Sequence, residues 1–354
     1  MRILVTGHRG YIGSVAIASL TAAGHEVTGL DTGFFEVCAN PNGRPADCRD
    51  VRDVTAAELA GLDAVVHLAA LSNDPLGALD SSLTLRINCE ATVALALAAR
   101  EAGVGRFVFA SSCSMYGAAG SGEPLDEESP LRPLTAYAES KVRSEEALFS
   151  LADSSFSPIC MRNATAYGAS RRLRVDLVLN NLVGWAHATG SVRVLSDGSP
   201  WRPLVHVEDI ARATLALLEA PRERVHAEAV NVGADSENYR VRDLAEIVAA
   251  TVPGSTIEYS GSGDPDPRSY RVSFGKLRQM LPELELTWDA RAGARQLLAE
   301  YRGMGLSQAA LVGERYNRVA CLRRSLASGA LDEDLRWTEG TGTAAGRASA
   351  AAPA

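Results

Sequence analysis

The sequence contains very little lysine. The chain has 35 basic side chains among 354 residues, but lysine occurs only as Lys141 and Lys276. The net charge is −8, so no excess of positive charge favours nucleic acid or an anionic membrane as a partner. An anionic small molecule would therefore need a local cluster of arginines.

Cysteine and histidine are also scarce, with six of each. No Cys-x-x-Cys spacing or His-rich segment is present, so we expect neither a metal site nor a disulfide framework. The apolar run at 91–99 is too short to span a bilayer. The chain begins with a strand-like run at 2–5 in place of a signal peptide, so we expect a cytoplasmic protein without a membrane partner.

Strands and helices alternate through the first two-thirds of the chain. Short apolar strands are predicted at 3–5, 26–30, 64–68, 106–110 and 158–161. Helices are predicted between them at 13–23, 56–59, 83–102 and 136–152. Continuous apolar strands separated by helices indicate a parallel sheet covered on both faces. The predicted fold class is α/β, a Rossmann-type doubly wound parallel sheet with a smaller, partly discontinuous C-terminal lobe.

This alternation loosens after about residue 170, which suggests a division of the chain. We expect residues 1–170 to bind a dinucleotide, with returning segments at about 200–235. Residues 171–337 should form most of a substrate lobe and a helical stretch running from Ala290 to about Leu335. Residues 338–354 are rich in Gly, Ala, Thr and Ser and are predicted to be a disordered tail.

Three glycines follow the first predicted strand and open the first helix. Such a loop lets the backbone approach a pyrophosphate, which the helix N-terminus then attracts. The spacing is G-x-x-G-x-x-G, and the predicted cofactor contacts are Gly7, Arg9, Gly10, Tyr11, Ile12 and Gly13. Asp31 ends the second strand, where an acid can bind ribose hydroxyls and repel a 2′-phosphate, so NAD is favoured over NADP. Asp50 and Val51 are predicted to contact adenine.

Tyr137 and Lys141 are spaced four residues apart on a predicted helix. Residues i and i+4 share a helix face. A compact ammonium beside a phenol favours the phenolate and lowers its pKa, whereas the planar guanidinium of arginine does not fit the same space. The scarce lysine therefore predicts that Tyr137 performs acid–base chemistry.

These motifs and several others occur in the order typical of one superfamily. They are Thr6-Gly-x-x-Gly-x-x-Gly13, His67-Leu68-Ala69-Ala70, Asn88, Ser111-Ser112-x-x-x-Tyr116-Gly117, Tyr137-x-x-x-Lys141, Arg162 with Tyr167-Gly168, and Arg202-Pro203-Leu204-Val205-His206-Val207-x-Asp209. Over roughly residues 1–285 the chain resembles the extended short-chain dehydrogenase/reductases, within the nucleotide-sugar epimerase/dehydratase group, and in particular enzymes of the UDP-glucose 4-epimerase type.

The resemblance implies a role for each matching residue. Tyr137 would be the general base and acid, Lys141 would lower its pKa and hold the nicotinamide ribose, and Ser112 would bind the reacting oxygen. Further cofactor contacts would come from Leu68, Ala69, Ala70, Ser111 and Asn88, with Asn88 bracing that side of the site. Substrate contacts would come from Ser112, Thr165 (where the family often has Asn), Asn180, Asn181, Arg202 and Arg268.

Residues next to Ser112 bear on the reaction. The resemblance implies that 4,6-dehydratases carry an Asp-Glu pair at the positions of Cys113 and Ser114. Decarboxylases and 3,5-epimerases would need Glu or Cys at the position of Ser114, so all three reactions are disfavoured. Cys113 is expected to be a buried packing residue. C4 epimerisation of a nucleotide-diphosphate sugar with bound NAD remains; the alternatives are a net ketoreductase or dehydrogenase and, more remotely, a non-catalytic NAD-binding regulator. The family also implies a homodimer formed by the helices at 83–102 and 136–152.

Overall fold

The computed structural model describes residues 1–354 except 40–44, 73, 78–79, 119–121, 261–268 and 339–354. The predicted substrate contact Arg268 therefore lies outside the described residues. So does the predicted tail, apart from Thr338.

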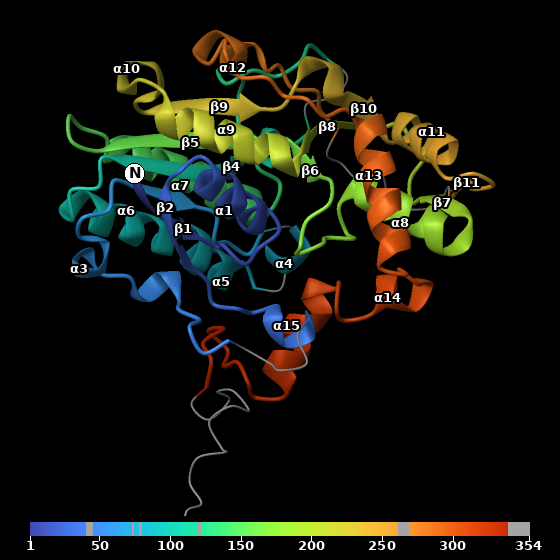
Figure 1. The fold of residues 1–354 in the computed structure, drawn as a ribbon, viewed down its shortest axis with the longest axis horizontal. Coiled ribbons are helices and arrows are strands. Elements are labelled where there is room, and N and C mark those ends of the chain that lie inside the picture. Colours follow the sequence, from blue (N-terminus) through green and yellow to red (C-terminus); the bar gives the residue numbers. More distant parts are fainter. Residues whose placement is uncertain (40–44, 73, 78–79, 119–121, 261–268, 339–354) are drawn as a thin grey trace, which may run out of the picture.

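Six parallel strands form the central sheet, in the order β2-β1-β3-β4-β5-β9 (Figure 1). The strands are β1 (Arg2–Thr6), β2 (Glu26–Leu30), β3 (Ala64–His67), β4 (Arg106–Ser112), β5 (Ser157–Asn163) and β9 (Glu228–Val232). One face packs against α1 (Gly13–Ala22), α9 (Val207–Glu219) and α12 (Gly275–Met280). The other face packs against α3 (Ala56–Leu59), α6 (Ala91–Glu101) and α7 (Ala136–Ser150). The predicted doubly wound parallel sheet is thus confirmed.

Smaller elements build the C-terminal half. Two short sheets are formed by β10 (Asn238–Arg240), β8 (Trp201–His206) and β6 (Thr165–Tyr167), and by β11 (Thr256–Tyr259) with β7 (Ser191–Val194). The helices α8 (Val178–Thr189), α11 (Val241–Thr251) and α13 (Ala290–Gly303) share one apolar core with them. Helix α9 packs on the central sheet and β9 is its last strand. On this basis we propose that the segment at about 200–235 returns to the first body and that the domain boundary lies near residue 170.

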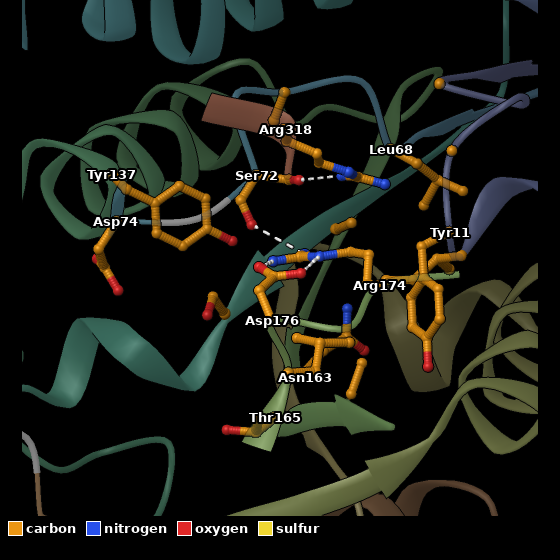
Figure 2. A pocket seen from close by; sticks show the side chains of 18 of the residues that line it. Tyr11, Leu68, Ser72, Asp74, Tyr137, Asn163, Thr165, Arg174, Asp176 and Arg318 are labelled. Atoms are coloured by element: carbon orange, nitrogen blue, oxygen red, sulfur yellow. Dashed lines mark hydrogen bonds and ion pairs between the residues drawn. The ribbon is translucent and has the colours of Figure 1, made fainter. Parts of the chain in front are cut away.

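A cavity of about 680 Å³ opens where the parallel strands end. Its wall includes the glycine loop after β1, Ser112 at the end of β4, Tyr137 on α7, and Arg202 on β8. Figure 2 shows side chains from separate segments, among them Tyr11, Tyr137 and Thr165, around this cavity. Ligands of α/β sheets bind at the carboxyl ends of the strands, so this cavity is the candidate active site.

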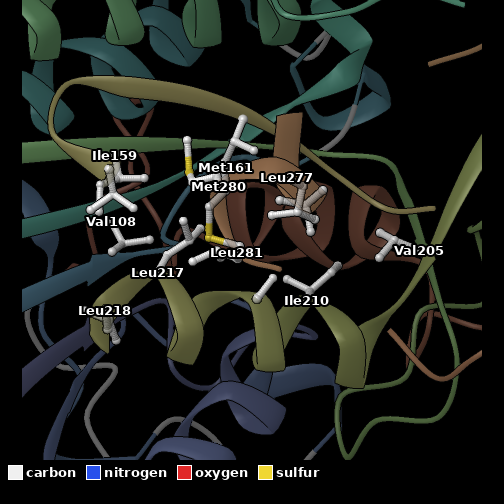
Figure 3. Close-up of a cluster of buried hydrophobic side chains, with 14 of the residues drawn as sticks. Val108, Ile159, Met161, Val205, Ile210, Leu217, Leu218, Leu277, Met280 and Leu281 are labelled. Carbon is white, nitrogen blue, oxygen red and sulfur yellow. The ribbon is translucent and has the colours of Figure 1, made fainter. Parts of the chain in front are cut away.

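Alternating strand residues fill the cores on the two faces of the sheet. Val66 pairs with Val108, and Val108 with Ile159, so these three side chains form one continuous row. They are fully buried against Ile210 and other side chains of α9 (Figure 3). Their neighbour Phe107 points to the core on the opposite face. This two-sided burial explains why the strands are apolar along their whole length.

The helical stretch predicted from Ala290 to about Leu335 consists of three helices. The segment forms α13, α14 (Gln308–Val312) and α15 (Arg318–Ala327), which are separated by turns. Gly305 ends α13 with φ +61, a left-handed conformation that terminates helices. The remaining short elements are α2 (Glu36–Ala39), α4 (Asp74–Gly77), α5 (Ser81–Leu85), α10 (Arg222–Val225), three 3-10 turns at Val51–Asp53, Cys113–Tyr116 and Asp235–Glu237, and a π turn at Arg86–Glu90.

A disulfide joins Cys38, on α2, to Cys321, on α15, contrary to the expectation of no disulfide. The two cysteines are 283 residues apart, and only the return of the C-terminal helices to the N-terminal part of the sheet brings them together (Figure 1). No local spacing in the sequence could have indicated this pair.

One continuous helix, Ser81–Glu101, is long and apolar enough to cross a membrane by length and composition. However, half of its apolar window is buried inside the protein. Leu95, Ala96 and Ala99 lie in the core beneath the central sheet. Its hydrophobicity is therefore explained by packing.

Candidate active site

The glycine loop is folded tightly against its own backbone. Gly7 has φ +71, and a Cβ on Gly13 would lie 2.1 Å from the carbonyl oxygen of Gly7. The Gly10 N–H donates to that same carbonyl oxygen at 2.9 Å. Side chains at these positions would force the loop and the first turn of α1 apart. The compact loop leaves backbone N–H groups at a helix N-terminus beside the cavity, an arrangement that fits the pyrophosphate of a dinucleotide.

Carboxylates follow the glycine loop on the adenosine side. Asp31 accepts hydrogen bonds from the backbone N–H of Arg9 at 3.1 Å and of Gly33 at 2.8 Å, and it lines the cavity. Asp50 also lines the cavity, but both of its oxygens accept from the Arg52 guanidinium at 2.6–3.0 Å. The position of Asp31 is that expected of a ribose ligand. Because the Asp50 carboxylate is occupied by Arg52, Val51 is the better candidate for the predicted contact with adenine.

Several buried polar atoms of the cavity wall have no hydrogen-bond partner within the described part of the chain. They are Ser111 Oγ, Ser114 Oγ and Asn163 Oδ1. Buried polar groups in folded proteins are almost always satisfied. Their convergence on one cavity indicates that a polar ligand completes their hydrogen bonds.

Tyr137 stands in the first turn of α7, and its position is fixed by the helix cap. Thr135 accepts a hydrogen bond from the Ala138 N–H at 3.1 Å and donates its hydroxyl proton to Asp74 at 2.6 Å. Burial raises the pKa of Tyr137 to about 12. A hydrogen bond with Ser112 and the positive charge of Arg174 both act to lower that pKa. The predicted pair Tyr137 and Ser112 is thus brought together.

Lys141 is buried one turn further along α7. Its ammonium donates to the Ala110 carbonyl oxygen at 2.7 Å and lies 5.7 Å from the centre of the Tyr137 ring. Burial lowers its pKa to about 8.

A variant with Lys141 replaced by Met should show how this buried amine responds to pH. The folded pKa of about 8 lies below the ordinary 10.5, so the unfolded chain binds more protons between these values. The free energy of unfolding of the wild type should therefore rise from pH 8 to pH 10 by on the order of 2–3 kcal/mol relative to Lys141→Met. Denaturant titrations of dinucleotide-free protein measure this, and parallel pH profiles would contradict it.

Two arginines that the sequence analysis missed as ligands occupy the cavity. Arg174 lies between Tyr137 and Tyr11 and pairs with Asp176 at 2.5 Å (Figure 2). Arg318, from α15, enters from another side and donates to Ser72 Oγ at 3.1 Å. The run of arginines at 171, 172 and 174 was visible in the sequence as a local basic cluster. Arg318 had no such signal, because only the fold brings α15 to the cavity.

The predicted substrate contacts divide into two groups. Thr165, Asn181 and Arg202 line the cavity. Asn180 does not; its fully buried amide accepts from the Gly168 N–H at 3.0 Å and donates to the hydroxyl of Tyr11 at 3.2 Å. Asn180 therefore supports the wall behind the site, because its amide is used for internal hydrogen bonds.

Asn88 likewise lies behind the site. Its amide bonds both the N–H and the carbonyl oxygen of Leu71, at 2.8 and 3.1 Å, and it donates to Ser140 Oγ at 3.3 Å. It thus ties the segment after β3 to α7, in agreement with a bracing role. The predicted cofactor contacts Leu68, Ala69 and Ala70 all line the cavity.

Cys113 is a buried packing residue, as predicted. It is 1% exposed in the core, and its thiol donates to the Arg162 carbonyl oxygen at 3.1 Å. Burial raises the pKa of this thiol well above its ordinary range. Within the described residues, no group of three or more His, Cys, Asp or Glu side chains could hold a metal ion.

Comparison with known proteins identifies the family. The model of the "NAD dependent epimerase/dehydratase family" matches residues 3–233. The chain is 31% identical to a UDP-glucose 4-epimerase of Corynebacterium glutamicum, covering 79% of this chain and 90% of that protein. It is 30% identical to a dTDP-glucose 4,6-dehydratase of Streptomyces griseus, covering 79% and 88%.

A solved structure of MoeE5 with UDP-glucose and NAD has the same fold, with a TM-score of 0.72 and 28% identity. The match covers 87% of this chain and all of that one. The glycine loop, Asp31 and the unsatisfied polar atoms fit a bound dinucleotide. The chain belongs to the NAD dependent epimerase/dehydratase family, and NAD is its cofactor.

Proposed function

We propose that the protein catalyses reversible C4 epimerisation of a nucleotide-diphosphate sugar. The observation that carries this proposal is the composition of the wall beside Ser112. Tyr137 and Ser112 face the cavity, Cys113 points into the core, and Ser114 offers only a hydroxyl. Elimination of water or loss of carbon dioxide would need a further acid or base there. Similarity to UDP-glucose 4-epimerases supports the same reaction.

Tyr137 would move the proton. Its Oη takes the proton of the sugar C4 hydroxyl, while Ser112 holds the reacting oxygen in place. Bound NAD supplies the oxidising power by accepting a hydride and returning it. The resulting 4-keto sugar rotates in the site so that its opposite face meets the cofactor, and Tyr137 gives the proton back to the oxygen. The charge of Arg174 favours the phenolate during these steps.

The other cavity residues would bind and orient the two ligands. The glycine loop and Leu68 to Ala70 would hold the dinucleotide, Asp31 its adenosine ribose, and Lys141 its nicotinamide ribose. Arg202, Asn181 and Thr165 would bind the sugar nucleotide. Arginine meets phosphate with two parallel donors, which suits Arg202 to a diphosphate.

Incubation of purified protein with UDP-hexoses and UDP-hexuronic acids tests the reaction. We expect formation of the C4 epimer without added cofactor and without net NADH absorbance, because each turnover regenerates NAD. Stoichiometric consumption of NADPH or NADH with a 4-keto sugar would instead identify a ketoreductase. Absence of turnover with unimpaired NAD binding would favour a regulator.

We also propose a cytoplasmic homodimer. Leu97 on α6 is 47% exposed, and it lies on the helix pair, α6 and α7, that the family resemblance assigns to a four-helix interface. A monomer mass by light scattering would refute this assembly. The Cys38–Cys321 disulfide is unusual for a reducing compartment and is the observation that counts against a cytoplasmic location.

A further inference from the structure

The C-terminal strap, defined as residues 306–338, returns to the cofactor side of the protein (Figure 1). It carries α14 and α15 and lies beyond residues 3–233, which the family model matches. Leu322, Leu331 and Leu335 of the strap are buried against Phe34 and Leu71 in one apolar cluster. The strap therefore covers the segments that follow β2 and β3, which contribute to the cavity wall.

Polar contacts fix the strap to the same region. The indole N–H of Trp337 donates to the Thr32 carbonyl oxygen at 2.7 Å. Arg52 donates to the Asp334 carbonyl oxygen at 2.7 Å, and the disulfide joins Cys321 to Cys38. Thr32 directly follows Asp31, and Arg52 lies two residues after Asp50 and donates to its carboxylate, so both attachment points adjoin the predicted adenosine side. The strap is thus anchored on both sides of the adenosine end.

Arg318 is the strap residue that reaches into the cavity (Figure 2). Its guanidinium lies 4.7 Å from the centre of the Phe35 ring and donates to Ser72 Oγ at 3.1 Å. No carboxylate of the described residues lies within ion-pair distance of it. Burial and the neighbouring charge of Arg174 lower its pKa to about 9. A poorly solvated cation without a counter-ion is costly unless an anion binds beside it.

The two arginines whose charges act on Arg318 already have carboxylate partners. Arg172 pairs with Glu36, and Arg174 pairs with Asp176. Arg318 remains, and the carboxylates close enough to raise its pKa are Asp176 and Asp31. Arg318 shares the cavity wall with Asp31 of the predicted adenosine side and with Tyr137 of the predicted nicotinamide side. The pyrophosphate of a dinucleotide joins its two nucleosides, so it lies between these two ends.

We propose that Arg318 binds the pyrophosphate of NAD and that the strap thereby holds the cofactor in the cavity. A pyrophosphate brings the negative charge that this site lacks, and a guanidinium can donate two parallel hydrogen bonds to it. Binding by Arg318 rests only on NAD as cofactor. Its functional value rests on the proposed epimerisation, in which a cofactor that is restored in every turnover does not need to leave.

Calorimetric titration of NAD into dinucleotide-free protein tests this role without any sugar. Arg318→Met keeps the alkyl stem over Phe35 and removes the charge, so the Kd for NAD should rise by about tenfold or more. Arg318→Lys should fall between Met and the wild type. Arg323→Ala, an exposed arginine on the same helix, is the matched control and should stay within about twofold. Less NAD should also co-purify with Arg318→Met than with the control.

An unchanged Kd in folded Arg318→Met would overturn the proposal. Should that variant not fold, hydrogen exchange of the wild type decides: NAD should slow exchange in residues 318–327, and equal exchange with and without NAD would overturn it. Failure of the epimerase assay with normal Arg318-dependent NAD binding would contradict the proposed reaction alone.

Discussion

Replacement of Tyr137 by Phe should lower kcat by about 10²- to 10⁴-fold while leaving NAD bound. The phenol is an acid–base group that the structure places in hydrogen-bond contact with Ser112 in the cavity wall, and the variant removes only its hydroxyl. The expected loss lies in kcat, because the ring that shapes the cavity remains. Steady-state kinetics with the C4 epimer as product measures it.

Tyr239→Phe is the matched control for this variant. Tyr239, on β10, does not itself line the cavity, and its hydroxyl donates to Glu237 at 3.1 Å, so kcat should change by less than about twofold. Equal activity of Tyr137→Phe and the wild type would remove Tyr137 from the mechanism and, with it, the proposed proton transfer.

Replacement of Glu145 by Ala should destabilise the protein by about 3–5 kcal/mol. Glu145 on α7 pairs with Arg162 on β5 at 2.7 Å, and both side chains are less than a tenth exposed. The pair joins the helix that carries Tyr137 and Lys141 to the central sheet. Without Glu145 the remaining hydrogen-bond partners of the buried guanidinium among the described residues are neutral, namely the Tyr116 hydroxyl at 3.2 Å and the Glu127 carbonyl oxygen at 3.0 Å. Denaturant unfolding measures the loss.

The same helix provides the control for the buried pair. Glu139 pairs with Arg143 at the surface, where both side chains are more than 40% exposed, so Glu139→Ala should cost less than about 1 kcal/mol. A double variant, Glu145→Leu with Arg162→Met, should recover much of the stability lost in Glu145→Ala, since no unpaired charge remains. Equal losses of unfolding free energy for Glu145→Ala and Glu139→Ala would show that the buried pair stabilises the protein no more than the exposed pair does.

Local patterns predicted the parts of the site that depend on local geometry. The glycine loop, Asp31 and the Tyr137 helix are each read within a short stretch of sequence, and all of them line the cavity. Asn180 differs, because an amide can serve either a ligand or the protein interior. Only the fold shows that it bonds Tyr11 and Gly168.

Contacts between distant parts of the chain were beyond sequence analysis. Arg318 meets Ser72 across 246 positions, and Cys38 meets Cys321 across 283. Neither contact leaves a periodic pattern. The short strands β6 and β10, three residues each, were missed because so few residues cannot display alternation. The influence of Lys141 on the pKa of Tyr137 stays a prediction; the ammonium lies 5.7 Å from the centre of the Tyr137 ring and donates to the Ala110 carbonyl oxygen.

A substrate labelled with deuterium at C4 tests the central claim most directly. The protein should convert such a nucleotide sugar to its C4 epimer with the deuterium still at C4, because the hydride is removed and returned within one turnover. Mass spectrometry and proton NMR of the product report the label. Epimer that has lost the label, or deuterium transferred to free dinucleotide, would contradict epimerisation by a retained cofactor.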